Sequence, residues 1–287
     1  MVPVGVGQSV RLVRVARDLG ATAANLTPSY AIYLAQIVRQ ELGVDPAELG
    51  LQKIIVGGEP GGGIPGTRKQ LEETWNADVR EAYGMVDIHP MMGGECWVKG
   101  GMHFLAPDLV HAELVNIETG EPLEMRPGVR GEVVYTAIER EANPVLRFRS
   151  HDVIEVQHVG RCECGRTGYR FTVVGRTDDM LIVRGINVYP SAIEDVLQGI
   201  EGLTGHLAIL LDKPAPHDSL DVIVEQATGV SAERLGELKR YAEKRISELL
   251  LFRPNLTIVP PGMLPRFELK AKRVYRLYAG DKSPDQP

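Results

Sequence analysis

The chain has 287 residues, a formal net charge of −6 and a hydrophobic content of 44%, enough for two compact domains with apolar cores. Its Lys and Arg residues are scattered, which excludes the basic footprint of a nucleic-acid-binding protein. The longest apolar runs are too short to cross a bilayer, and the N-terminal residues lack the pattern of a signal peptide. With an odd number of cysteines, three, these features predict a cytoplasmic protein with reduced thiols and no membrane partner.

The first ninety residues are predicted to alternate between helices and short buried strands. Apolar stripes at helical spacing indicate helices over residues 10–19, 28–42 and 65–75. Leu51–Val56 and Val79–Tyr83 are short apolar runs typical of buried strands. This order predicts an α/β layer with ligand-binding groups at the strand ends.

The pattern of apolar and turn residues changes twice after this layer. From about residue 91 to residue 177, β-branched and alternating segments separated by turn residues predict an antiparallel sheet or barrel. Strands then alternate with helices over Ser191–Gln198 and Ser231–Leu251, as in a small α+β domain. We therefore expect one domain over residues 1–177, with an α/β part over about 1–90, and a second domain over 178–287.

Seven motifs resemble those of the phenylacetate–coenzyme A ligases, a branch of the adenylate-forming superfamily. They are Thr27–Ala31, Gly58–Pro60, Tyr83–Met85, Arg147–Asp152, Cys162–Thr167, Gly175–Pro190, and Leu264–Arg266 with Lys270–Arg273. They follow the order and spacing of the family over almost the whole chain. The resemblance implies that residues 1–177 are an α/β and β-barrel-like remnant of a large AMP-binding domain. Residues 178–287 would be the small, mobile α+β lid domain at its C-terminal side.

The resemblance implies a two-step ligase reaction. ATP and a small aromatic acid such as phenylacetate would give an acyl-adenylate and pyrophosphate, and the thiol of coenzyme A would then attack the activated carbonyl. The acid carboxylate must approach a phosphorus surrounded by negative oxygens, so the site needs Mg²⁺ and a mobile cation. Lys270 is implied as that cation, and Asp178 as the hinge of the lid domain.

The resemblance also implies two binding regions. An aromatic face beside a glycine would form a shelf for adenine, and the two oxygens of Asp152 can accept hydrogen bonds from both ribose hydroxyls. The residues implied for the nucleotide are Gly58, Glu59, Pro60, Tyr83, Gly84, Asp152 and Arg176. After rotation of the lid domain, Arg184, Gly185 and Asn187 would line the tunnel for coenzyme A.

Val86 and Asp87 depart from the family's pattern. The family has a Ser or Thr hydroxyl that meets the phosphate, followed by a Glu that helps to hold Mg²⁺. Valine cannot donate a hydrogen bond, and aspartate reaches less far than glutamate. Asp87 is the candidate Mg²⁺ ligand, and weakened catalysis is the alternative interpretation.

A separate set of residues offers the ligand atoms of a zinc site. Cys162 and Cys164, with Cys96 and His103 on a nearby predicted strand, could complete a tetrahedral structural Zn²⁺ site. The alternative is a group of buried free thiols that pack as small apolar side chains.

The sequence lacks a Ser/Thr/Gly-rich loop that would wrap the β- and γ-phosphates, because Gly57–Gly66 has no hydroxyl cluster and no Gly-Lys-Ser/Thr ending. We expect the chain to begin inside the family's large domain, with part of a sheet facing solvent or a partner, either a second copy or a separate N-terminal half. Two other functions stay open. One is a truncated AMP- or acyl-binding or interaction module without ligase activity, and the other is an AMP-transferring relative, as in deazaflavin adenylation, that does not use coenzyme A.

Overall fold

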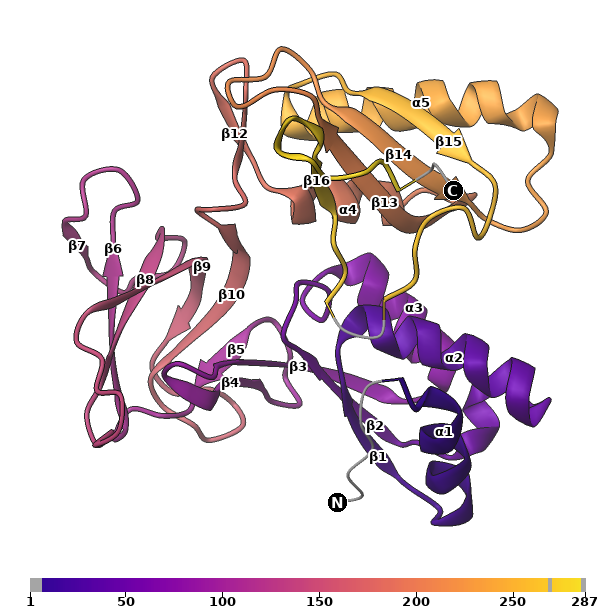
Figure 1. Ribbon diagram of the computed structural model, residues 1–287. Coiled ribbons are helices and arrows are strands. Elements are labelled where there is room, and N and C mark those ends of the chain that lie inside the picture. Colours follow the sequence, from indigo (N-terminus) through magenta and orange to yellow (C-terminus); the bar gives the residue numbers. More distant parts are fainter. Residues whose placement is uncertain (1–6, 268–269, 285–287) are drawn as a thin grey trace. The chain divides into compact units, whose positions relative to one another are not determined.

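The computed structural model describes residues 7–267 and 270–284, and these fold into two compact units (Figure 1). The first unit contains residues 7–178 and residue 270, and the second contains residues 179–267 and 271–284. Each unit has its own hydrophobic core. Among the described residues, no helix combines the length and the apolar character needed to span a membrane.

The first unit begins with parallel strands and three helices. The strands are β1 (Ala23–Leu26), β2 (Lys53–Gly57) and β3 (Asp78–Met85), and the helices are α1 (Ser9–Asp18), α2 (Pro28–Leu42) and α3 (Pro65–Trp75). A short 3₁₀ turn, η1 (Pro46–Leu49), precedes β2. Trp75 of α3 is fully buried and its indole N–H donates to the carbonyl of Ala31 in α2 over 3.2 Å. Helices and strands therefore share one core.

Local sequence fixes the ends of α2. The Thr27 side chain accepts a hydrogen bond from the Tyr30 amide, and Pro28 occupies the first helical position, where its missing N–H is not needed. The helix ends at Gly43, whose φ of 67° is a left-handed conformation that glycine adopts without strain. The predicted helix over residues 28–42 is confirmed.

The parallel strands continue into a long antiparallel segment of the same sheet. Its strands are β4 (His89–Glu95), β5 (Met102–Phe104), β6 (Val110–Val115), β7 (Pro122–Leu123), β8 (Arg130–Ala137), β9 (Phe148–Val159) and β10 (Tyr169–Arg176). The order in this ten-stranded sheet is β1-β2-β3-β4-β5-β10-β9-β8-β6-β7. The predicted α/β and β-rich parts are therefore two halves of one sheet, and the strand direction changes between β3 and β4.

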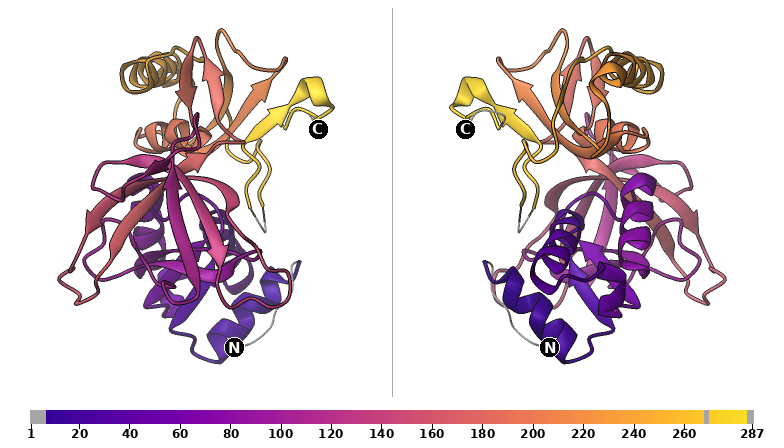
Figure 2. Two further views of the ribbon diagram at one scale, coloured as in Figure 1. Left: turned by 90° about the vertical axis from the view of Figure 1, so that its left-hand side faces the viewer. Right: turned by 90° about the vertical axis from the view of Figure 1, so that its right-hand side faces the viewer.

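The second unit places two helices on one face of a four-stranded sheet. Its elements are the hairpin β11 (Leu181–Val183) and β12 (Ile186–Val188), then α4 (Pro190–Gln198), β13 (Leu203–Leu211), β14 (Asp221–Gln226), α5 (Ala232–Leu250), β15 (Asn255–Val259), β16 (Val274–Arg276) and η2 (Leu277–Ala279). The sheet order is β15-β14-β13-β16. Figure 2 shows α5 along one side of this sheet.

Strand periodicity explains how this sheet has two apolar faces. Leu207, Ile209 and Leu211 alternate along β13 and pack in one core with apolar residues of α4 and α5. Ala208, which points to the opposite face, packs instead with Leu264 and its neighbours. The chain segment that follows β15 therefore covers the face that the helices leave open.

Gly84 lies where the backbone of β4 closely approaches that of β3. A Cβ atom on this residue would lie 2.0 Å from the carbonyl oxygen of Pro90. Because this oxygen belongs to the backbone, it cannot move away without shifting a strand. The resemblance implies a shelf for adenine at Gly84, and strand packing is a second reason for glycine there.

We expect Gly84→Ala to lower the free energy of unfolding by about 1–3 kcal/mol, because the added methyl group forces two strands apart. Urea denaturation of both proteins measures the difference. The matched control is Gly236→Ala on α5, where the added Cβ would meet only the Arg240 side chain at 3.8 Å. That control should be neutral or more stable by about 0.5–1 kcal/mol. Equal stability of Gly84→Ala and the parent would contradict the expected clash.

Candidate nucleotide site and candidate metal centre

The ends of two neighbouring parallel strands bring the predicted nucleotide residues to one edge of the sheet. Gly58, Glu59 and Pro60 follow β2, and Tyr83 and Gly84 lie near the end of β3. The two strands pair up to Gly57 and Ala82. The carboxyl ends of parallel strands are the usual place for ligand-binding groups in α/β sheets.

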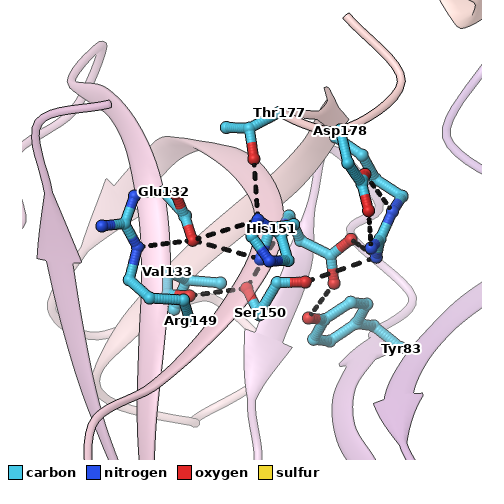
Figure 3. Close-up of polar contacts among 10 residues, drawn as sticks. Tyr83, Glu132, Val133, Arg149, Ser150, His151, Thr177 and Asp178 are labelled. Atoms are coloured by element: carbon cyan, nitrogen blue, oxygen red, sulfur yellow. Dashed lines mark hydrogen bonds and ion pairs between the residues drawn. The ribbon is translucent and has the colours of Figure 1, made fainter. Parts of the chain in front are cut away.

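A buried carboxylate joins β3 to the antiparallel strands. The hydroxyl group of Tyr83 donates to Oδ2 of Asp152 over 2.6 Å, and Nη1 of Arg176 donates to Oδ1 over 2.9 Å (Figure 3). Asp152 and Arg176 are also paired residues of β9 and β10. The structure thus brings together Tyr83, Asp152 and Arg176, which are far apart in the sequence.

Arg176 also holds Asp178, the last residue of the first unit. Its Nε and Nη2 atoms donate to the two carboxylate oxygens of Asp178 over 2.9 and 2.8 Å. This is the two-pronged geometry that suits a guanidinium group and a carboxylate. Arg176 therefore bridges Asp152, the predicted ribose-binding residue, and Asp178, the predicted hinge residue.

A bulge in β9 presents Asp152 toward Tyr83. Val134 and Glu132 of β8 each pair with a residue of β9. Between these two pairs, β9 contains two more residues than β8 does. His151, inside this bulge, has a φ of 62°, a left-handed conformation that is uncommon but tolerated by histidine. The Ser150 hydroxyl donates to the carbonyl of Val133 and accepts from the amide of Asp152 at 3.1 Å.

Sequence reasoning missed Glu132, which anchors the other side of this bulge. Its side chain is fully buried and accepts from Nε of Arg149 at 2.8 Å and from the His151 amide at 3.2 Å (Figure 3). Burial alone would raise its pKa, but the hydrogen bonds from Arg149 and His151 hold the pKa below the usual range. A glutamate at an inward position of the apolar strand Gly131-Glu-Val-Val-Tyr was the available signal.

The pKa values of Asp152 and Asp178 are shifted in opposite directions. Burial raises the pKa of Asp152, although the hydrogen bonds from Tyr83 and Arg176 oppose the shift. The hydrogen bonds from Arg176 lower the pKa of the more exposed Asp178. Burial, together with the nearby Tyr135 and Asp152, raises the pKa of the Tyr83 hydroxyl, so that it remains a donor.

Glu59 faces the beginning of α2. Its Oε1 atom accepts a hydrogen bond from the Ser29 amide at 2.8 Å and another from the Ser29 hydroxyl. Amides in the first turn of a helix lack partners within the helix and favour a negative charge. The preceding Gly58 has a φ of 86°, which fits the turn from β2 into this loop.

A second buried carboxylate, Glu81 of β3, lies under the glycine-rich loop after β2. A Cβ atom on Gly63 would be only 2.8 Å from Oε2 of Glu81, so the loop passes directly over the carboxylate. Burial, together with the charge of Glu95, raises the pKa of Glu81 to about 7. Arg68 holds the same loop, since its Nε atom donates to the carbonyl of Gly62 over 2.8 Å and its Nη2 atom pairs with Glu95 at 2.7 Å.

The two residues that depart from the family pattern lie in the turn between β3 and β4. Val86 is 84% exposed, and Asp87 is exposed beside it. The carbonyl groups of Val86, Asp87 and Ile88 all accept hydrogen bonds from Nη1 of Arg140. This guanidinium group fixes the backbone of the turn, and the Asp87 carboxylate beside it stays open to solvent.

The residues predicted for coenzyme A lie on the hairpin β11–β12 of the second unit. Val183 pairs with Ile186, so the turn contains only Arg184 and Gly185. Both have positive φ angles, 50° and 80°, as a tight two-residue hairpin turn requires. Asn187 is exposed on β12, and Lys270 of the first unit is also exposed.

The four predicted zinc ligands come together in the first unit. One ligand atom from each of Cys96, His103, Cys162 and Cys164 lies within 4.8 Å of the others. The Sγ atoms of Cys96 and Cys162 are 3.9 Å apart, and Nε2 of His103 is 3.4 Å from Sγ of Cys164. The Arg166 amide and side chain lower the pKa of the Cys164 thiol to about 7, so a thiolate is accessible there near neutral pH.

Comparison with known proteins finds relatives along most of the chain. Residues 185–277 match the family described as AMP-binding enzyme C-terminal domain. Over 285 residues the chain is 33% identical to the phenylacetate–coenzyme A ligase of Thermus thermophilus, and the match covers 93% of this chain and 63% of that protein. It is 30% identical to the phenylacetate–coenzyme A ligase of Escherichia coli K12, covering 96% of this chain and 63% of that protein. The chain is thus similar over most of its length to phenylacetate–coenzyme A ligases, and residues 185–277 are similar to the C-terminal domain of AMP-binding enzymes.

Solved structures show the same similarity. A crystal structure of 2-hydroxyisobutyryl-CoA ligase in the postadenylation state, in complex with R3-HIB-AMP, is 31% identical, with a TM-score of 0.87 over 96% of this chain and 58% of that one. An anthranilate CoA ligase in complex with anthranoyl-AMP, at 15% identity and a TM-score of 0.63, shows the same fold. The chain spans 63% of the length of the two ligases named above, less than two thirds.

The ionisation of Glu81 makes the free energy of unfolding depend on pH. Its pKa rises from 4.5 in the unfolded chain to about 7 in the folded one, so its stabilising protonation is complete below pH 4.5 and is lost as pH rises through 7. We expect Glu81→Gln to be the more stable protein at pH 8, by on the order of 1–3 kcal/mol, and to show a flatter dependence between pH 5 and pH 8.

Urea denaturation at several pH values measures this effect. The control is Glu139→Gln, which changes an exposed glutamate of the same unit. Parallel pH dependences for the parent and Glu81→Gln would show that the carboxyl group is ionised throughout this range.

Proposed function

We propose that this chain carries part of an AMP-forming acid–thiol ligase, which forms an acyl-adenylate from ATP and a small aromatic acid and transfers the acyl group to coenzyme A. The observation that carries the proposal is the joining of Tyr83, Asp152 and Arg176 by short hydrogen bonds at one edge of the first unit. The relatives described as phenylacetate–coenzyme A ligases support the choice of acid and thiol.

The proposed nucleotide pocket uses groups that are already oriented. Each oxygen of Asp152 receives one hydrogen bond from the protein and keeps acceptor capacity for a ribose hydroxyl. The edge-on packing of Tyr83 against Phe171, with ring centroids 5.6 Å apart, fixes the tyrosine ring beside it. Glu59 and Pro60 would form the opposite wall for adenine, next to Gly58.

Magnesium and the phosphate groups would meet the turn between β3 and β4. A single exposed carboxylate, Asp87, fits the way Mg²⁺ binds, through one or two carboxylates and substrate phosphates, with water in its other positions. When bound, the ion supplies positive charge that offsets the phosphate oxygens. The Arg140 guanidinium group would keep the turn in place.

The two half-reactions, and the rotation of the lid domain between them, are proposed to depend on Lys270, Asp178 and the hairpin β11–β12. Lys270 would bring a positive charge to the carboxylate and α-phosphate during adenylate formation. We propose a large AMP-binding domain up to residue 177 and a mobile lid from residue 178, with the hinge at Asp178. Arg184, Gly185 and Asn187 would line the path of coenzyme A.

A second candidate function is AMP or acyl binding without ligase activity. Val86 favours it, because its exposed isopropyl group cannot donate a hydrogen bond to phosphate. In either case β1 forms one end of the sheet order, so a partner, either a second copy or a separate N-terminal half, would add its strand at this edge.

In a full-length preparation that performs both half-reactions, Lys270→Ala should abolish acyl-adenylate formation and largely spare thioester formation from a presynthesised adenylate, because phosphorus needs the extra positive charge only in the first step. Pyrophosphate exchange with a panel of aromatic acids measures the first step, and consumption of coenzyme A measures the second. The control is Lys272→Ala, whose ammonium group already pairs with Asp281 at 2.5 Å. Equal losses in both steps would remove Lys270 from its proposed role.

We further propose that Cys96, His103, Cys162 and Cys164 hold a structural zinc ion. The donor set of three sulfur atoms and one imidazole nitrogen is typical of closed tetrahedral sites. The ion would cross-link β5, which carries His103, to the loop of Cys162 and Cys164 that precedes β10. Such a site needs reduced thiols, in agreement with the cytoplasmic location that we propose.

Metal analysis should find about one zinc ion per chain, and Cys162→Ser should release it and lower the melting temperature. Binding of AMP should change little in this variant, because the proposed metal site shares no residue with the proposed nucleotide pocket. An exposed hydroxyl change in the same unit, Thr119→Ala, is the matched control. A metal-free parent of unchanged stability would show that these cysteines are simply packed thiols.

A further inference from the structure

Two arginine–glutamate pairs of the second unit flank the position of Lys270 in the sequence. Arg266, four residues before Lys270, pairs with Glu225 of β14, and Arg273, three residues after it, pairs with Glu194 of α4. Neither pair is used by the proposed nucleotide site or the proposed metal site. Both carboxylates are almost completely buried.

The first pair fixes the chain before Lys270. Arg266 donates to both oxygens of Glu225, from Nη1 over 3.0 Å and from Nη2 over 2.7 Å. Oε1 of Glu225 also accepts the backbone amide of Leu264, and Nη1 of Arg266 reaches the carbonyl of Leu264 over 2.9 Å. The side chain of Leu264 is buried in the same region. A carboxylate with no exposed surface thus holds both the backbone and the side chain of this segment.

The second pair fixes the chain after Lys270. Nη2 of Arg273 donates to Oε1 of Glu194 over 2.8 Å, and its Nε atom lies 2.6 Å from Oε2. The carbonyl of Arg273 accepts the amide of Ile209 over 2.7 Å, which begins the pairing of β16 with β13. Side chain and backbone of Arg273 are therefore tied to two different elements of the unit.

A half-buried histidine next to the first pair, His206, stays neutral at neutral pH. Burial, reinforced by the charges of Arg266 and Arg273 and opposed by that of Glu225, lowers the pKa of His206 to about 4. At neutral pH it adds no third positive charge that would compete for the carboxylates.

We propose that these two pairs form a double anchor that positions Lys270, so that Glu225, Arg266, Glu194 and Arg273 are positioning residues for adenylate formation. The inference rests on the proposed function of Lys270. Three residues extend at most about 11 Å, so the Cα atom of Lys270 can lie no farther than that from the Cα atom of Arg273. The anchors hold Arg266 and Arg273 in place, on either side of Lys270 in the sequence.

The two-pronged Arg266–Glu225 pair explains why a charged group serves here better than an apolar contact would. A planar guanidinium group that meets both oxygens of a carboxylate fixes direction as well as distance. An apolar contact would fix burial alone. The orientation of the chain at both ends limits the conformational entropy that Lys270 loses when it meets its anionic partners.

Two experiments test the double anchor. Glu225→Gln and Glu194→Gln each keep the shape of the side chain but remove its charge, and Lys244→Ala on α5, which breaks an exposed ion pair with Glu248, is the control. Digestion by a lysine-specific protease under native conditions reports the freedom of the chain at Lys270. We expect cleavage after Lys270 to accelerate about tenfold in each glutamine variant and not in the control.

The second experiment separates positioning from a general loss of structure. In a preparation that performs both half-reactions, each glutamine variant should slow pyrophosphate exchange about tenfold and leave thioester formation from a presynthesised adenylate within about twofold of the parent. Lys270→Ala combined with Glu225→Gln should be no slower in exchange than Lys270→Ala alone, because the anchor acts through the lysine.

The results distinguish the anchor from the proposed function. Unchanged cleavage in both glutamine variants would overturn the anchor, whatever the role of Lys270. Equal slowing of both half-reactions would also overturn it, since the pairs would then only support the fold. Faster cleavage together with full exchange activity in Lys270→Ala would keep the anchor as a structural device and remove the catalytic role of the lysine. If one glutamine variant does not fold, the other decides, because the two pairs lie on different elements.

Discussion

The buried carboxylate of Asp152 is the group on which the proposed nucleotide site depends. A negative charge without partners in such a place would destabilise the fold, so the structure must supply donors to both of its oxygens. Tyr83 supplies one from β3 and Arg176 supplies the other from β10. The bonds that satisfy this one charge therefore also link β3 of the parallel half to β9 and β10 of the antiparallel half.

The backbone around Asp152 shows the same constraint. The bulge in β9 interrupts regular pairing with β8, and His151 adopts a left-handed conformation within it. Glu132 compensates by accepting hydrogen bonds from Arg149 and from the His151 amide. Strained backbone is tolerated where surrounding interactions hold it. The buried carboxylates of Glu132 and Asp152 thus stabilise the bulge in β9. The bulge in turn directs the Asp152 carboxylate toward Tyr83.

Much of the fold could be predicted from the sequence, because α2, α4 and α5 have regular apolar spacing and recognisable ends. β1 was missed since Ala-Ala-Asn-Leu has low β propensity, and its pairing with β2 is what makes it a strand. The motifs indicated Asp152 and Arg176 as candidate site residues, but they did not predict the hydrogen bond between the two. They also indicated no role for Glu132 or Glu81. Partners of a buried charge come from distant strands, and local patterns do not record which strands become neighbours.

The cores of the two units share no residue, and this has a consequence for measurements on the whole chain. Apolar residues of α4, α5 and β13 form one cluster, and those around Trp75 and Tyr135 form others. Cooperative unfolding follows a shared core, so heating should give separate transitions, and a single midpoint would average over unrelated events. Each substitution therefore changes the stability of the unit that contains it. Calorimetry that resolves two unfolding enthalpies is the natural way to assign its effect.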